Sequence, residues 1–149
     1  ASDVYKRQVR GICTLRPGIA GVSDNITVRS IVGRFLEHHR LFYFRNGGNE
    51  KIFLSSADWM PRNLNERVEL MIPIEDKRHK ARIKGILDLY LVDTLKAHLM
   101  RSDGSYYKVS NIEGPLSAQE ELMEAANTQD SREQMTVIER FKPMFKMKE

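Results

Sequence analysis

Cysteine and long apolar runs are scarce in this sequence, and each shortage excludes a class of protein. Cys13 is the single cysteine among 149 residues, so an internal disulfide is excluded and a reducing, cytoplasmic setting is expected. No stretch approaches the roughly 18 consecutive apolar residues of a membrane span. No signal peptide opens the chain. The sequence therefore predicts a soluble globular protein.

Several motifs that identify an enzyme class by themselves are also missing. The chain has no G-x-x-x-x-G-K-[ST] phosphate loop and no G-x-G-x-x-G dinucleotide turn. It has neither a C-x-x-C pair nor an H-E-x-x-H motif, two common signs of a metal or redox site. Neighbouring residues of a strand face opposite sides, so His38 and His39 are not expected to bind one metal ion together. We expect no metal ligand in this chain.

The residues that are present describe a mildly basic chain. It is 41% hydrophobic and 30% charged, and it is long enough to bury a core in one domain. The net charge of +4 permits an anionic partner, and nucleic acid, nucleotide and polyphosphate all fit it. The sequence starts with the polar letters ASDVYKRQ and no initiator methionine. We expect residues 1–8 to be a truncated or non-native leader.

The pattern of apolar residues predicts strands in both halves of the chain and helices in the second. The segment NGGN favours a hairpin, because Asn and Gly tolerate positive φ, and Ser102 to Gly104 favours another. Asp76 is a plausible helix cap, and Ser117 to Glu120 reads as a capping box. The expected strands are 9–15, 26–32, 40–44, 51–55, 66–74, 96–100 and 106–109, and the strand 66–74 is expected to be buried. The expected helices are 76–92 and 117–126.

These elements predict an α/β or mixed α+β fold, with one mixed sheet flanked by helices. Residues 9–126 are expected to form the domain. Residues 127–149 are polar and basic, which is typical of a mobile tail.

The first candidate site is the His38–Arg40 pair. If residues 37–44 are extended, His38 shares a face with Arg40, while His39 points the other way. A guanidinium holds phosphate oxygens bidentately, and a histidine can take or give a proton near neutral pH. The alternative is that both histidines are solvated residues at the edge of a strand.

Two further clusters carry chemistry-bearing side chains. The loop after residue 55 concentrates hydroxyls, a carboxylate, a guanidinium and an amide, which can bind an oxyanion or orient a histidine. Its candidates are Ser55, Ser56, Asp58, Arg62 and Asn63. The alternative is a well-capped turn in which Asp58 binds backbone amides and Trp59 fills the core. Arg10 lies in a predicted strand beside Gly11, which would let a ligand approach closely.

With these residues identified, a family resemblance becomes specific. The segments VRGICTLRPGIAGVSDNITVRSIVGRFLEHHR and NGGNEKIFLSSADWMPRNLNERVELMIPI resemble the C-terminal region of bacterial polyphosphate kinase. The likeness covers residues 9–116 almost continuously, and SSADWM-x-RNL is its most characteristic part. In that family two consecutive domains each resemble half of a phospholipase D. This chain is similar to the second half, so the resemblance implies a phospholipase D-like half fold in a fragment of a longer protein.

The resemblance implies an enzyme that moves the terminal phosphate of ATP reversibly onto polyphosphate through a phosphohistidine. That histidine belongs to the preceding domain, so the isolated chain is expected to be inactive. Arg10 and His38 match the family residues at the ATP phosphates, with His38 as an acid/base or phosphate-stabilising group. Mg²⁺ is expected for the full enzyme, although no ligand for it is assignable here.

The resemblance also implies the partners. They are ATP or ADP, inorganic polyphosphate, the N-terminal and first phospholipase D-like domains, and a second copy in a homo-oligomer, with no specific nucleic acid. The expected location is cytoplasmic, or membrane-associated for the full enzyme.

Two other functions remain open from the residues. A phosphodiesterase half of the phospholipase D superfamily would carry H-x-K, but Arg40 replaces that lysine and Arg45 stands at the acidic position. A non-catalytic polyanion-binding module would interleave aromatic and basic residues on one face. Phe42, Tyr43 and Phe44 alternate faces instead, which is typical of a core strand.

Overall fold

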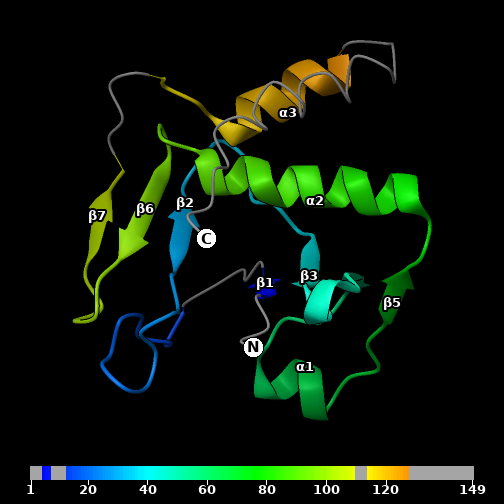
Figure 1. Ribbon diagram of the computed structural model, residues 1–149, viewed down its shortest axis with the longest axis horizontal. Coiled ribbons are helices and arrows are strands. Elements are labelled where there is room, and N and C mark those ends of the chain that lie inside the picture. The colour runs from blue at the N-terminus through cyan, green and yellow to red at the C-terminus, as the bar shows by residue number, and fades with distance from the viewer. Residues whose placement is uncertain (1–4, 8–12, 110–113, 128–149) are drawn as a thin grey trace. The chain divides into compact units, whose positions relative to one another are not determined.

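The computed structural model describes residues 5–7, 13–109 and 114–127, and its chain folds as two compact units (Figure 1). The first unit takes its described residues from 1–13 and 36–87, and the second from 14–35 and 88–149. Each unit has its own antiparallel sheet. The sites that follow lie within one unit or the other.

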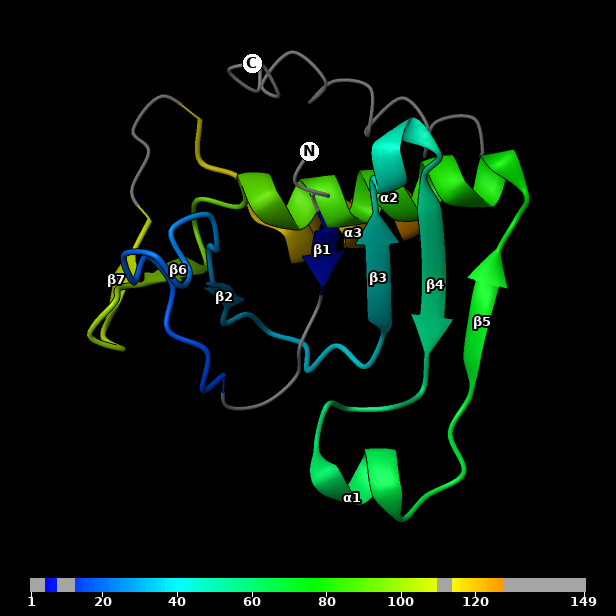
Figure 2. The same ribbon diagram turned by 60° about the horizontal axis from the view of Figure 1, so that its bottom comes forward.

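The sheet of the first unit is built around a hairpin. Its strands are β1 (Tyr5–Arg7), β3 (Arg40–Phe44), β4 (Lys51–Ser55) and β5 (Met71–Ile74), in the order β1-β3-β4-β5. Figure 2 shows β3, β4 and β5 side by side. The hairpin between β3 and β4 forms where it was predicted, and a short 3₁₀ turn (Asn46–Gly48) closes it. Asn46 and Gly47 adopt φ values of 47° and 61°, the left-handed region that Asn and Gly tolerate best.

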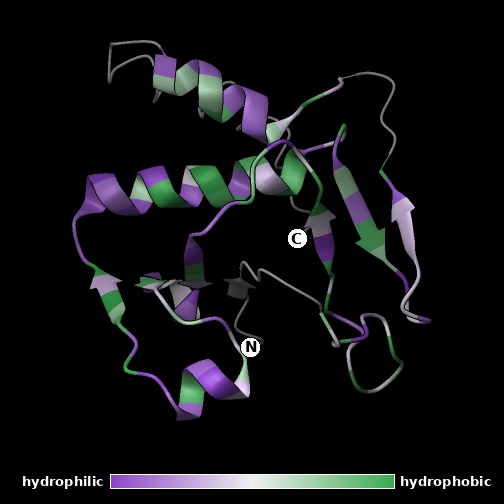
Figure 3. Cartoon of the chain, turned by 180° about the vertical axis from the view of Figure 1, so that it is seen from behind, coloured by the Kyte–Doolittle hydropathy of each residue, from purple (hydrophilic) through white to green (hydrophobic). Residues whose placement is uncertain are grey.

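The core of the first unit lies between this sheet and helix α2 (Lys77–Val92). Strand alternation puts Leu41 and Tyr43 on one face, where they pack with Ile52 and Leu87, and all four are at most 5% exposed. Figure 3 shows why the helix contributes to a core, because hydrophobic and hydrophilic residues alternate in bands along α2.

Polar contacts fix the two ends of this core. At the start of α2, the Asp76 carboxylate accepts hydrogen bonds from the backbone N–H groups of Arg78 and His79, which confirms the predicted cap. In the loop between β3 and β4, the Glu50 carboxylate accepts hydrogen bonds from Lys84 Nζ at 2.8 Å and from the Tyr43 hydroxyl at 2.5 Å. The hydrogen bond from Lys84, followed by that from Tyr43, holds the pKa of Glu50 below its ordinary value.

The second unit joins a three-stranded sheet to helix α3 (Ala118–Asn127). Its strands β2 (Arg29–Ile31), β6 (Ala97–Met100) and β7 (Tyr106–Lys108) run in the order β2-β6-β7. The predicted hairpin between β6 and β7 and the predicted cap of α3 are confirmed, with Ser117 Oγ accepting from the backbone N–H of Glu120.

A fully buried carboxylate organises the second unit. Asp93 has no exposed surface, and its oxygens accept hydrogen bonds from the backbone N–H groups of Lys96 at 2.7 Å and Ala118 at 2.8 Å. Its carbonyl accepts a hydrogen bond from the half-buried Arg29 guanidinium, whose pKa burial lowers. One side chain thereby links the turn before β6 to the first turn of α3.

The structure confirms a mixed α+β fold but corrects the expected sheet. In the described residues there are two antiparallel sheets in place of one mixed sheet. The reason is local: tight turns close antiparallel hairpins, whereas a parallel pair needs a long crossover. The strands before and after α2, β5 and β6, are not partners, so no parallel pair arises from that connection.

Other expected elements differ in detail. The predicted strand 9–15 lies mostly outside the described residues, and Cys13 to Leu15 is not a strand. The strand expected at 66–74 is shorter, and it is exposed rather than buried, because β5 is the outer strand of its sheet with Met71 and Ile72 each 52% exposed. Helix α1 (Pro61–Asn65) was not expected, although Pro61 suits a first helical turn. No described helix is both long and apolar enough to cross a bilayer.

Candidate functional site

The candidate site forms at the end of the first sheet where β3 begins and β4 ends. Arg40, the first residue of β3, lies opposite Ser55, the last residue of β4. The chain leaving β4 therefore passes beside the chain entering β3, as Figure 2 shows for the end of the sheet nearest α1. This register brings Asp58 next to Arg40, although the two residues are 18 positions apart.

Three side chains meet there. Arg40 Nε donates a hydrogen bond at 2.9 Å to Asp58 Oδ1, and its Nη2 forms an ion pair with the same oxygen at 2.8 Å. Its Nη1 lies 2.5 Å from the carbonyl oxygen of His38 and 2.6 Å from His38 Nδ1. His38 lies just before β3 rather than in it, and this contact puts its ring beside the Arg40 side chain, as the predicted pair requires. We call these three residues the histidine trio.

Burial divides the trio into a hidden pair and an exposed ring. The side chains of Arg40 and Asp58 are 6% and 15% exposed, whereas His38 is exposed. A buried guanidinium is tolerable because a carboxylate and two further acceptors satisfy its donors. Those donors are engaged inside the protein, so His38 is the member of the trio whose ring is exposed to solvent.

The neighbouring histidine has a different environment. His39 is half-buried, and burial lowers its pKa, while Glu37 opposes that shift and Arg40 adds to it. The two rings therefore lie in different environments. His38 is the histidine joined to the buried ion pair.

Two of the remaining loop candidates, Ser56 and Asn63, bind a residue that sequence reasoning missed. The Glu69 carboxylate accepts hydrogen bonds from the hydroxyl of Ser56 and, at 3.0 Å, from the side-chain amide of the buried Asn63. Ser56 Oγ in turn accepts from the backbone N–H of Leu70 at 3.0 Å. Ser55 Oγ accepts a hydrogen bond from the backbone N–H of Ala57. Ser55, Ser56 and Asn63 thus find partners within the loop, and Glu69 was missed because it fell inside the strand expected at 66–74.

Other candidate residues lie apart from the trio or outside the described chain. Arg62 is exposed on α1, and Arg10 lies outside the described residues. Trp59 does not fill the core: it is 60% exposed, with its ring centroid 6.2 Å from that of the buried Phe42. Within the described chain, no three His, Cys, Asp or Glu side chains lie close enough together to hold a metal ion.

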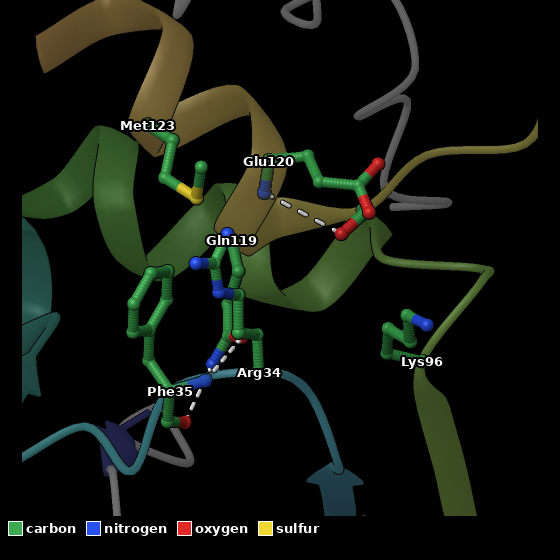
Figure 4. A pocket seen from close by; sticks show the side chains of 7 residues that line it. Arg34, Phe35, Lys96, Gln119, Glu120 and Met123 are labelled. Atoms are coloured by element: carbon green, nitrogen blue, oxygen red, sulfur yellow. Dashed lines mark hydrogen bonds between the residues drawn. The ribbon is translucent and has the colours of Figure 1, made fainter.

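The second unit contains a separate small cavity of about 130 Å³ (Figure 4). Gln119 projects from α3 into it and is hydrogen-bonded to the backbone of Phe35, accepting from the N–H at 3.0 Å and donating to the carbonyl at 2.8 Å. Arg34, Lys96 and Met123 also line the cavity. The Gln119 amide thus pairs with both backbone polar groups of Phe35, so this side chain has a structural role in joining α3 to the segment before β3.

Comparisons with known proteins all point to one group. A family model described as polyphosphate kinase C-terminal domain 2 matches residues 6–119. The chain is 54% identical over 118 residues to a polyphosphate kinase of Pseudomonas aeruginosa, which covers 78% of this chain and 17% of the relative. It is 58% identical over 103 residues to a polyphosphate kinase of Bacillus anthracis, covering 69% of this chain and 15% of the relative.

A solved structure shows the same similarity in three dimensions. The crystal structure of polyphosphate kinase from Porphyromonas gingivalis matches with a TM-score of 0.74 and 40% sequence identity, over 79% of this chain and 18% of that one. The chain therefore spans less than a fifth of the length of the relatives that it matches.

Proposed function

The chain belongs to the family described as polyphosphate kinase C-terminal domain 2, and from that premise we propose that it supplies one half of a phosphoryl-transfer site. The transfer is that of the terminal phosphate of ATP to inorganic polyphosphate, and its reverse. The observation that carries the proposal is the histidine trio, which presents the exposed ring of His38 on a buried, charge-paired support. His38 is the residue proposed to contact the phosphate.

Phosphoryl transfer requires the kind of cationic and N–H donor groups that this chain carries. Charge spreads over the equatorial oxygens of the transferred group, so catalysis depends on positioning and on donors aimed at those oxygens. The overall charge of +4 favours an anionic substrate. In the proposal, Arg10 is a second phosphate ligand, and Mg²⁺ accompanies ATP without a ligand assigned to this chain.

The site is proposed to be incomplete without more chain. The relatives are about six times longer than the matched segment, and the family resemblance puts the phosphorylated histidine in the preceding domain. We therefore expect the isolated chain to bind ATP or polyphosphate weakly and to form no product. Homo-oligomerisation and the cellular location of the full protein stay predictions.

The test is a hybrid enzyme in which this chain replaces the matching segment of the Pseudomonas aeruginosa polyphosphate kinase. In the active hybrid, His38→Ala is expected to lower kcat by about 10²–10³-fold, the usual cost of removing one donor to a developing oxyanion. His39→Ala is the matched control, and turnover is expected to stay close to that of the hybrid. Equal losses for the two variants would contradict the assignment of His38.

A second arm tests the divided site. The isolated chain is incubated with ATP, Mg²⁺ and a polyphosphate primer, and product is measured by consumption of ATP. Synthesis at the rate of the hybrid would show that the chain needs no preceding domain. Cleavage of a phosphodiester substrate by the isolated chain would favour the phospholipase D-type alternative.

A further inference from the structure

We propose that Arg40 and Asp58 are positioning residues that hold the neutral ring of His38 in the tautomer with its hydrogen on Nε2. His38 then meets a phosphate oxygen as an N–H donor and not as a nucleophile. The donor role toward phosphate rests on the proposed function, whereas the tautomer depends on the histidine trio alone.

The first step is the chemistry of the contact between two nitrogens. Arg40 Nη1 lies 2.6 Å from His38 Nδ1. A guanidinium has only donors and keeps its proton in proteins, so Nδ1 must be the acceptor. A neutral imidazole carries one ring hydrogen, and with Nδ1 accepting, that hydrogen is on Nε2.

The second step is that Arg40 cannot easily leave this position. Asp58 holds the guanidinium by Nε and Nη2, at 2.9 and 2.8 Å. Nη1 also donates to the carbonyl oxygen of His38 at 2.5 Å, so one nitrogen binds both the backbone and the ring of the same residue. The side chain of Arg40 is 6% exposed, and moving it would separate a charge pair in a poorly hydrated place.

The third step is what this arrangement leaves for the substrate. Nδ1 is occupied, and Nε2 carries a hydrogen in place of a lone pair, so neither nitrogen is set to attack phosphorus. The Nε2–H group of an exposed ring can donate to a phosphate oxygen without any proton leaving the histidine. Among the roles that the family resemblance implied for His38, this one is phosphate stabilisation.

The wild-type chain gives a direct test. The protein is labelled with ¹⁵N-histidine, and a long-range ¹H–¹⁵N spectrum is recorded at mildly alkaline pH, where an ordinary imidazole is neutral. His38→Gln identifies the signals of His38 by their loss. We expect Nδ1 of His38 to resonate as an unprotonated nitrogen and Nε2 as a protonated one. The opposite pattern, or averaged shifts, would overturn the proposal.

Two variants test the cause of the tautomer. Arg40→Met removes the donor, and both ring nitrogens of His38 are expected to move toward averaged shifts. Asp58→Asn keeps the size of the support and weakens it, so a smaller movement in the same direction is expected. His98 serves as the internal control because its ring contacts the backbone of Lys96 instead. Unchanged His38 shifts in a folded Arg40→Met variant would contradict the positioning role. If neither variant folds, the wild-type spectrum alone tests the proposed tautomer.

Activity separates this proposal from the proposed function. In the hybrid enzyme, Asp58→Asn is expected to lower kcat by about 10–100-fold, the usual cost of disturbing a partner that orients a functional histidine. The loss should not add to that of His38→Ala, because both changes remove the same interaction. If the wild-type chain shows the expected tautomer but His38→Ala leaves the activity of the hybrid undiminished, the proposed function is refuted and the positioning role of Arg40 and Asp58 stands. If His38→Ala abolishes activity but the ring carries its hydrogen on Nδ1, the positioning role is refuted and the proposed function stands.

Discussion

Replacing Gly33 with alanine is expected to destabilise the protein, because the side chain of Gln119 fills the space that a methyl group needs. A Cβ at Gly33 would lie 2.2 Å from Oε1 and 2.6 Å from Cδ of Gln119, far inside contact distance. That amide cannot swing away freely, since it is 5% exposed and is bound to the N–H and carbonyl of Phe35. The methyl therefore competes with two hydrogen bonds.

The size of the effect follows from those two bonds. Each contributes about 1 kcal/mol net, and a buried group left without a partner costs about 1–3 kcal/mol. The backbone of Phe35 is partly accessible to water, so part of the loss is recovered, and a total of about 2 kcal/mol is expected. Against a typical stability of about 5–15 kcal/mol, a loss of this size is easily measured.

The assay is urea unfolding of four proteins: wild type, Gly33→Ala, Gln119→Ala and the double variant. Without the Gln119 side chain, the three atoms nearest to the methyl group at position 33 are removed, and the effect of the alanine should be neutral or stabilising by about 0.4–1 kcal/mol through the unfolded chain. The cycle should thus show a strong coupling between the two positions. Additive losses would refute the reasoning, because they would mean that the methyl and the amide do not compete.

Two further predictions concern charged groups. Asp58→Ala is expected to lower the free energy of unfolding, measured in urea, by about 3–5 kcal/mol, because it leaves a buried guanidinium unpaired. The double variant Arg40→Met/Asp58→Ala should recover most of that loss. A double variant no more stable than Asp58→Ala would contradict this. The lowered pKa of Glu50 means that its contact with Lys84 stabilises the protein above the unfolded value near 4.5 and is lost as the pH falls through the lower folded value. Glu50→Gln should flatten that part of the pH profile of the urea midpoint, and an unchanged slope would argue against it.

Local signals in the sequence predicted local structure well. The NGGN turn, the Asp76 cap and the Ser117 cap each specify backbone geometry within a few residues, and all three are found. Sheet organisation was predicted wrongly, because pairing between strands distant in sequence leaves no comparable mark. The apolar run ending at Ile74 reads the same whether a strand is central or outermost, so burial was assigned where there is exposure.

The candidate site was predictable in part for the same reason. Alternation along a strand was enough to join His38 to Arg40, since the two are close neighbours in the chain. That Asp58 satisfies Arg40 depends on the register of the hairpin and was not visible in the residues. The sequence suggested Arg40 as a phosphate ligand because a guanidinium binds phosphate well. Its burial beside Asp58 depends on neighbours that are distant in the chain, so it could not be predicted.

Strand β5 has a consequence for how the chain behaves at high concentration. It is the outermost strand of its sheet in the described part of the chain, and its apolar side chains would make it a template for a foreign strand. Pro73 lies in the middle of that strand and has no N–H to offer. Proline suits an outer strand because the missing donor faces away from the partner. The row of N–H donors that a further strand would pair with is therefore interrupted at Pro73, which disfavours amyloid-like addition of strands at this edge of the sheet.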